Sequence, residues 1–259
     1  MKLGVQGGSR TFERLPHSDA AALFDVEGGV VREEVAAGGA TASPVEPGVA
    51  AEAGLALLLV HGRGGSAEDA LELGRALRRL LPTGARGESS PLYAPQAEAA
   101  SWYPSSFLAP PERNQPWLRG ALELLRRSSA RLEGLGFPRR RQIVAGFSQG
   151  ACLACELVGR EGGRWGGLVA FTGALPGPLD EPLSGYGPPD PEVEQPWLDG
   201  TPVLLSSGDP DPHVPFSRVR ETASLLERLG AAVTVDRYPG RPHTVLAAEL
   251  QRAAQVLSV

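Results

Sequence analysis

The chain contains a serine in a setting that can make a hydroxyl group a nucleophile. Ser148 is the centre of the pattern G-x-S-x-G at 146–150, between an apolar run at 143–145 and an apolar, helix-like segment at 151–158. A strand, a tight turn and a helix are expected in that order, which is the setting of a nucleophile elbow. The flanking glycines are needed because a Cβ there would clash with the neighbouring strand and helix. The amide of Gln149 would start the helix and could stabilise an oxyanion.

An ordinary turn between a strand and a helix would also fit this pentapeptide, since the chain holds 33 glycines. The other groups that an activated serine requires are therefore informative. A histidine must accept the serine proton, and a carboxylate must orient that histidine. His243 follows the last predicted strand, and both Asp209 and Asp211 follow the strand before it. The spacing supports His243 as the base and leaves the choice between the two aspartates open.

A second oxyanion donor is expected in the segment His-Gly-Arg-Gly-Gly at 61–65, which follows an apolar run at 55–60. Glycines at the end of a strand let the backbone approach a ligand closely, so the amide of Arg63 is the expected partner of the Gln149 amide. Loss of one such donor typically costs about 2.7–4 kcal/mol of transition-state stabilisation. His61 is expected to hold this loop by hydrogen bonds and not to act as the base.

Strands and helices alternate along the chain and predict an α/β fold. The expected strands are apolar runs, and the expected helices carry apolar residues on one face. Such alternation predicts a mostly parallel sheet with helices on both faces, and a length of 259 residues is compatible with a single domain over 1–259. The strands are predicted at 55–60, 92–94, 143–145, 168–171, 202–206 and 232–238, and the helices at 66–80, from about 114 to 132, and at 151–158, 216–230 and 245–259.

Two segments fall outside this alternation. Residues 1–50 are expected to be an N-terminal extension, in which 23–26 and 30–35 allow a hairpin at the sheet edge around a Glu-Gly-Gly turn. Residues 177–200 carry many prolines and acidic residues. That composition cannot form a core element, so we expect an ordered surface loop beside the cleft or a partial lid.

The segment 101–108 concentrates aromatic residues in a predicted loop. Aromatic side chains in loops can line an apolar cleft, so Trp102, Tyr103 and Phe107 are predicted to bind substrate, together with Trp197 of the later loop. The alternative is that these rings pack the loop onto the body of the protein.

Two further clusters have simpler interpretations. Cys152 and Cys155 form the C-x-x-C pattern of redox pairs, but they fall on the helix after the serine, where their spacing favours core packing. Asp209, Asp211 and His213 could in principle ligate a metal. No second cluster in the sequence completes a coordination shell, so no metal is expected. His213, beside the acid, is interpreted either as a residue that supports the site without touching the substrate or as a surface residue.

Composition restricts the partners and the location. A net charge of -5 argues against nucleic acid, because phosphate binding needs a basic surface. Residues 1–18 lack the apolar core of a secretory signal, and the longest clean apolar run, 55–60, is too short to span a bilayer. We therefore expect a cytoplasmic protein without stable membrane insertion that acts on a small molecule.

Several separated motifs agree in order with a known family. HGRGG, SWYPSSFL, GFSQG, GDPDPHVP and YPGRPHT together resemble the bacterial carboxylesterase and phospholipase family of α/β-hydrolases, which are relatives of the acyl-protein thioesterases. The resemblance runs from about Leu55 to the C-terminus. In that family the acid is the aspartate shortly before Val-Pro, which implies Asp211, while Asp209 would help to shape the turn. The family uses no metal.

Arg63 departs from this resemblance, because the thioesterase relatives commonly have an apolar residue at that position. Its guanidinium could bind an anionic group of the substrate, or it could pair with Glu68 or Asp69.

The resemblance implies a serine carboxylesterase that hydrolyses short to medium acyl esters through an acyl-enzyme and needs no cofactor. Ser148, His243 and Asp211 would form the catalytic triad, and the amides of Arg63 and Gln149 the oxyanion hole. One alternative is a lysophospholipase or acyl thioesterase that acts on longer chains. Another is a non-catalytic binding protein on the same scaffold, although such a protein would not need an intact nucleophile, base and acid.

Overall fold

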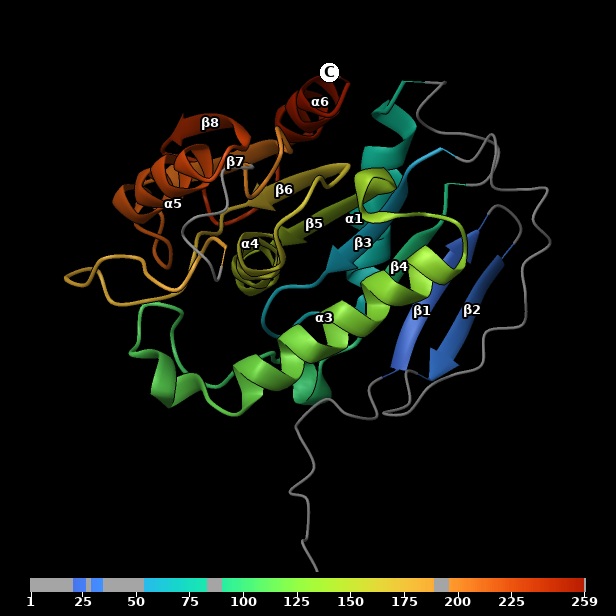
Figure 1. Cartoon of the computed structure of the whole chain (residues 1–259), viewed down its shortest axis with the longest axis horizontal. Helices are drawn as coiled ribbons and strands as arrows, with labels where there is room; N and C mark the ends of the chain where they lie inside the picture. Colours follow the sequence, from blue (N-terminus) through green and yellow to red (C-terminus); the bar gives the residue numbers. More distant parts are fainter. Residues whose placement is uncertain (1–20, 27–28, 35–53, 83–89, 189–195, 259) are drawn as a thin grey trace, which may run out of the picture.

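The strands of this computed structural model form one sheet. The structure describes residues 21–26, 29–34, 54–82, 90–188 and 196–258. Within these residues, eight strands pair in the order β2-β1-β4-β3-β5-β6-β7-β8 (Figure 1). The strands are β1 (Ala21–Val26), β2 (Gly29–Glu34), β3 (Ala56–Val60), β4 (Leu92–Pro95), β5 (Gln142–Phe147), β6 (Gly167–Phe171), β7 (Pro202–Asp209) and β8 (Ala232–Pro239). The helices are α1 (Ala67–Leu80), α3 (Trp117–Gly134), α4 (Gln149–Glu161), α5 (Phe216–Arg228) and α6 (Ala247–Val256), with short 3-10 turns η1 (Glu98–Ala100), η2 (Pro111–Asn114) and η3 (Arg139–Arg141).

The pairings along β4-β3-β5-β6-β7-β8 are all parallel, which confirms the prediction of a mostly parallel sheet. The hairpin of β1 and β2 adds an antiparallel pair at the β4 edge, as the sequence allowed. The rest of the predicted extension, including the turn at 27–28, lies outside the described residues. Because parallel strands end at the same edge, the loops after β3, β5, β7 and β8 all meet there.

Helices cover both faces of the sheet, as the alternation predicted. Successive residues of a strand point to opposite faces, and this divides the core into two clusters. On one face, Leu58 and Val144 pack with the apolar sides of α3, α4 and α5. On the other face, Leu57 and Ile143 pack with α1 and α6. The central strands are therefore buried on both sides, which explains their continuous apolar sequences.

Ser66 ends the loop after β3 and starts α1. Its Oγ accepts a hydrogen bond from the amide of Asp69 at 3.2 Å, and its own amide donates to the carboxylate of Asp69 at 2.7 Å. This capping box satisfies two backbone donors that the first turn would otherwise leave unpaired. The helix thus holds the end of the loop that contains Arg63.

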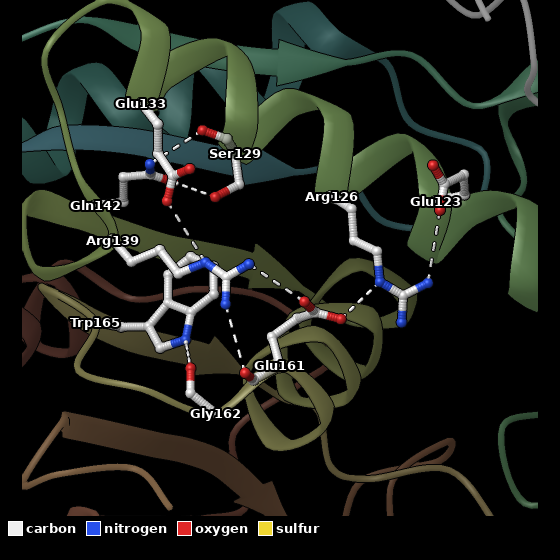
Figure 2. Close-up of polar contacts among 9 residues, drawn as sticks. All are labelled: Glu123, Arg126, Ser129, Glu133, Arg139, Gln142, Glu161, Gly162 and Trp165. Carbon is white, nitrogen blue, oxygen red and sulfur yellow. Dashed lines mark hydrogen bonds and ion pairs between the residues drawn. The ribbon is translucent and has the colours of Figure 1, made fainter.

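A network of charged side chains anchors the far end of α4 (Figure 2). Glu161, the last residue of α4, accepts hydrogen bonds from Arg126 of α3 at 2.6 Å and from Arg139 of η3 at 3.2 Å. The guanidinium of Arg139 also lies 5.1 Å from the centroid of the Trp165 ring. The same carboxylate therefore connects α3 with the end of α4 and with the entry to β5. The last two, α4 and β5, are the elements that flank Ser148.

We predict that Glu161→Ala lowers the free energy of unfolding by about 1–2 kcal/mol, because the hydrogen bonds of a charged group are lost but the arginines stay partly hydrated. The Glu161 side chain is 18% exposed. Glu123→Ala is the matched control, because Glu123 is 42% exposed and makes one ion pair with Arg126 at 3.7 Å. That change should stay within about 0.5 kcal/mol in urea unfolding. Equal losses in the two variants would contradict a special role for Glu161.

Candidate active site

Ser148 lies on a strained turn between β5 and α4. Its backbone has φ 54° and ψ −121°, and residues other than glycine rarely adopt a positive φ. A Cβ on Gly146 would lie 2.5 Å from the carbonyl carbon of Gly150, and a Cβ on Gly150 would collide with the carbonyl oxygen of Val60. Both glycines of the motif are therefore required for the turn, as the sequence predicted. The amide of Ser148 donates to the carbonyl of Phe171 at 3.0 Å, which attaches the turn to β6.

The structure brings Ser148, His243 and Asp211 into one chain of hydrogen bonds. The Nε2 atom of His243 lies 2.9 Å from Ser148 Oγ, and its Nδ1 atom lies 2.9 Å from Asp211 Oδ2. His243 follows β8 and Asp211 follows β7, so loops after three strands of the sheet supply the three groups at one edge. In the neutral tautomer whose Nδ1–H donates to Asp211, Nε2 is free to accept the serine proton.

Asp211 is held as a carboxylate. Burial acts to raise the pKa of Asp211, but hydrogen bonds from His243 and from the amides of His213 and Val214 outweigh burial and lower the pKa. The two amides donate to Asp211 Oδ1 at 2.9 and 3.0 Å. Asp209 instead pairs with Arg237 at 2.7 Å. The structure therefore brings Asp211 to the histidine, in agreement with the assignment from the family resemblance.

The two predicted oxyanion donors belong to loops beside Ser148. Gln149 is the first residue of α4. Gly62, next to Arg63, lies so close to the serine that a Cβ added to it would be 3.6 Å from the Cβ of Ser148. The side chain of Gln149 is engaged elsewhere, because Oε1 accepts from the amide of Trp102 at 3.0 Å and Nε2 donates to the carbonyl of Tyr103 at 2.8 Å. These bonds leave the backbone amide as the group that Gln149 can offer to a substrate.

The guanidinium of Arg63 binds the loop 101–108. It donates to the carbonyls of Tyr103, Pro104 and Ser105 at 2.9, 3.0 and 2.8 Å, and to Ser101 Oγ at 3.2 Å. Both sequence hypotheses for this side chain need correction. It does not pair with Glu68 or Asp69, and its four terminal hydrogens already serve the loop, so they are not available to an anionic substrate group.

The partners proposed for Arg63 have other roles. Glu68 pairs with Arg75 at 2.8 Å, and Asp69 caps α1 through Ser66. From the opposite side of the loop, Asn114 accepts from the amide of Ser105 and donates to the carbonyl of Ser106, both at 2.9 Å. The loop is thus fixed from two sides by side chains that the sequence did not connect to it.

A cavity of about 620 Å³ opens at Ser148. Its walls include the loop 104–108 and the segment that follows Asp211. Of the aromatic residues predicted to bind substrate, Phe107 lines this cavity. Sequence reasoning missed other apolar wall residues, among them Leu108, Phe147, Val214 and Pro215. Val214 and Pro215 could have been found from their place directly after the acid, and Phe147 from its place before the nucleophile.

Trp102, Tyr103 and Trp197 do not line the cavity, which corrects three of the four predictions. Trp102 is fully buried, donates from Nε1 to the carbonyl of His61 at 2.8 Å and packs on that histidine ring at 4.7 Å. Tyr103 is buried at 2% exposure. Trp197 donates to the carbonyl of Gly159 at 2.9 Å. All three rings pack loops onto the body of the protein, which was the alternative.

The described parts of the predicted loop 177–200 do not line the cavity either. The amide of Gly177 donates to the carbonyl of Phe107 at 2.9 Å, so the segment starts beside the cavity wall. Residues 189–195 lie outside the described residues. The structure thus supports the prediction of a loop beside the cleft and provides no contact that would make its described part a lid.

His61 and the two cysteines have structural roles. His61 is buried, accepts from the amide of Ala97 at 3.1 Å and lies 2.8 Å from the carbonyl of Gly62, which confirms that it holds the loop. Cys152 and Cys155 are buried free thiols, and burial raises the pKa of Cys152 to about 12. This confirms that the two cysteines pack in the core.

His213 is exposed, and its ring lies 4.8 Å from that of His243. The described residues contain no group of three or more His, Cys, Asp and Glu side chains that could hold a metal ion.

The parallel sheet and the strained serine turn define the α/β-hydrolase fold, with a Ser-His-Asp arrangement at the expected edge. The chain belongs to the phospholipase/carboxylesterase family, whose sequence profile matches residues 45–259. Among solved structures, it is similar to a phospholipase/carboxylesterase from Dyadobacter fermentans, with 40% identity and a TM-score of 0.69 over 83% of this chain and 93% of that chain. The carboxylesterase of Bacillus cereus shares the fold at 20% identity, with a TM-score of 0.60 over 82% of this chain and 91% of that chain.

Among curated proteins, acyl-protein thioesterase 1 of Debaryomyces hansenii is 32% identical over 117 residues, which are 45% of this chain and 47% of that protein. The chain therefore spans about half the length of the curated relatives it matches. In the part of the chain that the structure describes, no helix has the length and apolar character needed to cross a membrane.

We predict that Gly150→Ala destabilises the protein by about 3 kcal/mol or more, the upper end of overpacking costs, because its Cβ would meet rigid backbone. Gly134→Ala is the matched control, because a Cβ at the end of α3 meets nothing within 4 Å. It should leave stability unchanged or slightly raised. Thermal unfolding of both variants measures the difference, and a well-folded Gly150→Ala protein would contradict the tight approach of the elbow to β3.

The lowered pKa of Asp211 predicts a pH-dependent contribution to stability. A carboxyl whose pKa is lower in the folded state stabilises the protein above its unfolded pKa of about 4, and the contribution is lost as the pH falls through the folded value. The free energy of unfolding of Asp211→Asn should therefore fall less steeply than that of the wild type as the pH is lowered below 4. Urea unfolding at several pH values tests this, and parallel curves would contradict it.

Proposed function

We propose that this protein is a serine carboxylesterase that hydrolyses esters of short to medium acyl chains through an acyl-enzyme intermediate. The observation that carries the proposal is the chain of 2.9 Å contacts from Ser148 Oγ through His243 to Asp211, at the opening of a cavity. Membership of the phospholipase/carboxylesterase family supports an ester bond as the target.

In the proposed mechanism, Ser148 Oγ attacks the ester carbonyl while His243 Nε2 accepts its proton. Asp211 keeps the imidazole in the required tautomer and stabilises the imidazolium. The amides of Arg63 and Gln149 donate to the oxyanion, and the positive end of α4 favours the same charge. The protonated His243 gives its proton to the leaving alcohol, and water then attacks the acyl-enzyme by the same route.

The cavity supports the proposed substrate class. A volume of about 620 Å³ lies within the range of small-molecule sites, and its apolar wall residues suit an acyl chain. No cofactor is needed for this chemistry. The proposal includes a single domain, a cytoplasmic location and no nucleic acid partner, and the net charge of -5 supports the last of these.

A thioesterase or lysophospholipase activity is the second candidate. Its support is the similarity to curated proteins named acyl-protein thioesterase 1, which covers about half of each. The same nucleophile, base and oxyanion donors would serve a thioester, so the acyl chain and the leaving group distinguish the candidates.

Hydrolysis of p-nitrophenyl esters from acetate to palmitate tests the proposal. We predict that Ser148→Ala lowers kcat by about 10⁴-fold or more, because the nucleophile of the triad is lost. Asp209→Asn is the matched control and should stay close to the wild type, since that carboxylate pairs with Arg237. The carboxylesterase proposal expects an optimum at short to medium chains.

An optimum at palmitate, with faster cleavage of a palmitoyl thioester, would favour the second candidate. Equal inactivity of the wild type and Ser148→Ala, together with resistance to a serine-directed phosphonate, would contradict both and favour a binding protein.

A further inference from the structure

Arg241 is a buried arginine in the loop that carries His243. It lies between Gly240 and Pro242, two positions before the histidine, and only 5% of its surface is exposed. An arginine is rarely so buried unless its charge and its donors have partners, because removing a guanidinium from water is costly. The partners of Arg241 therefore indicate what the residue is for.

Those partners are the backbone on both sides of His243. The Nη1 atom of Arg241 donates to the carbonyl of Pro242 at 2.9 Å and also to the carbonyl of Thr244. One nitrogen of the rigid guanidinium therefore binds both carbonyls, which holds them close to each other. The peptide unit before His243 and the one that follows Thr244 are thereby fixed by one side chain.

The same guanidinium connects this loop to the serine turn. Its Nη2 atom donates to the hydroxyl of Thr172, the residue that follows β6. The carbonyl of the preceding residue, Phe171, accepts the amide of Ser148 at 3.0 Å. Thr172 has a φ of 53°, an unfavourable value for a β-branched residue. A short path of hydrogen bonds therefore links the backbone of the nucleophile to the backbone of the base.

Glu249 balances the charge of Arg241. Its side chain is fully buried, and its carboxylate lies 3.3 Å from Nε of Arg241. It also accepts hydrogen bonds from Ser206 Oγ at 2.5 Å and from the amide of Leu246 at 2.9 Å. Loss of either partner alone would leave an unpaired buried charge, which destabilises strongly whatever the residue does for catalysis.

We propose that Arg241 is a positioning residue for His243. By fixing the backbone around the histidine, Arg241 keeps the imidazole aligned with Ser148 Oγ. This inference rests on the proposed function of the triad. The residue does not touch the substrate, so its loss should leave binding largely intact while the proton transfer becomes less well aligned. A displacement of about 1 Å in a reacting group can cost about 100-fold in rate.

The experiment compares Arg241→Met, Glu249→Gln and the double variant that carries both changes. The single changes each leave a buried charge unpaired, whereas the double variant removes both charges and keeps an amide that can still serve Ser206 and Leu246. We expect the double variant to recover the thermal stability lost in Arg241→Met. Its kcat on p-nitrophenyl esters should nevertheless stay lower by about 100-fold, with KM close to that of the wild type.

Two further variants sharpen the test. Arg241→Lys should not restore kcat, because a single ammonium nitrogen cannot replace the separate guanidinium nitrogens that face the two carbonyls, the Thr172 hydroxyl and Glu249. Arg252→Met is the matched control, because Arg252 of α6 hydrogen-bonds to Asp236 of β8 at 3.0 Å and to Gln255 at 3.4 Å. It should keep the wild-type kcat. A double variant with wild-type kcat would show that the pair serves stability alone and would overturn the proposal.

A measurement that needs no turnover separates this inference from the proposed function. The Nδ1 proton that His243 donates to Asp211 should give a downfield proton resonance, identified by its loss in His243→Gln. We expect this resonance in the wild type and in Arg252→Met, and its loss or broadening in the folded double variant. An unchanged resonance in the double variant would overturn the inference. A wild type that hydrolyses no ester but shows the expected pattern would refute the proposed function alone.

Discussion

The backbone of Ser148 is the constraint on which the rest of the structure depends. A positive φ is unfavourable for any residue other than glycine, so the surroundings must hold Ser148 in this conformation. The elbow glycines let β5, α4 and β3 approach within backbone contact, and the bond from the Ser148 amide to Phe171 attaches the turn to β6. The core on both faces of the sheet supports these strands. The packing therefore determines where the serine hydroxyl lies before any substrate arrives.

The other loops of the site are held by charged side chains that bind neutral backbone groups. Arg63 donates to three successive carbonyls of the cavity wall, and Arg241 donates to the carbonyls on both sides of His243. Asp211 accepts two backbone amides in addition to the histidine. Bonds of this kind to charged groups are stronger than neutral ones and leave little freedom to the loop. A site built from several loops can thus be preorganised without regular secondary structure.

Sequence reasoning was most successful where a local signal decided the structure. The strand, turn and helix around Ser148 and the buried strand β3 both depend on residues within a few positions. The choice of Asp211 over Asp209 required the family resemblance, because both follow the same strand. The aromatic residues were mostly assigned wrongly, since a loop has no periodicity that tells which rings face the cavity. Trp102 therefore packs beneath His61, whereas Phe107 lines the wall.

By itself, the sequence determined the order of elements, the strained turn at Ser148 and the residues that could form a triad. These features follow from short-range sterics and from the order of motifs on parallel strands. Only the tertiary structure decided the partners of Arg63 and Arg241. Arg63 binds a carbonyl 40 positions away, and Arg241 binds a hydroxyl 69 positions away. A guanidinium fits any suitably spaced set of acceptors, so its sequence neighbours carry no information about which acceptors the fold will bring to it.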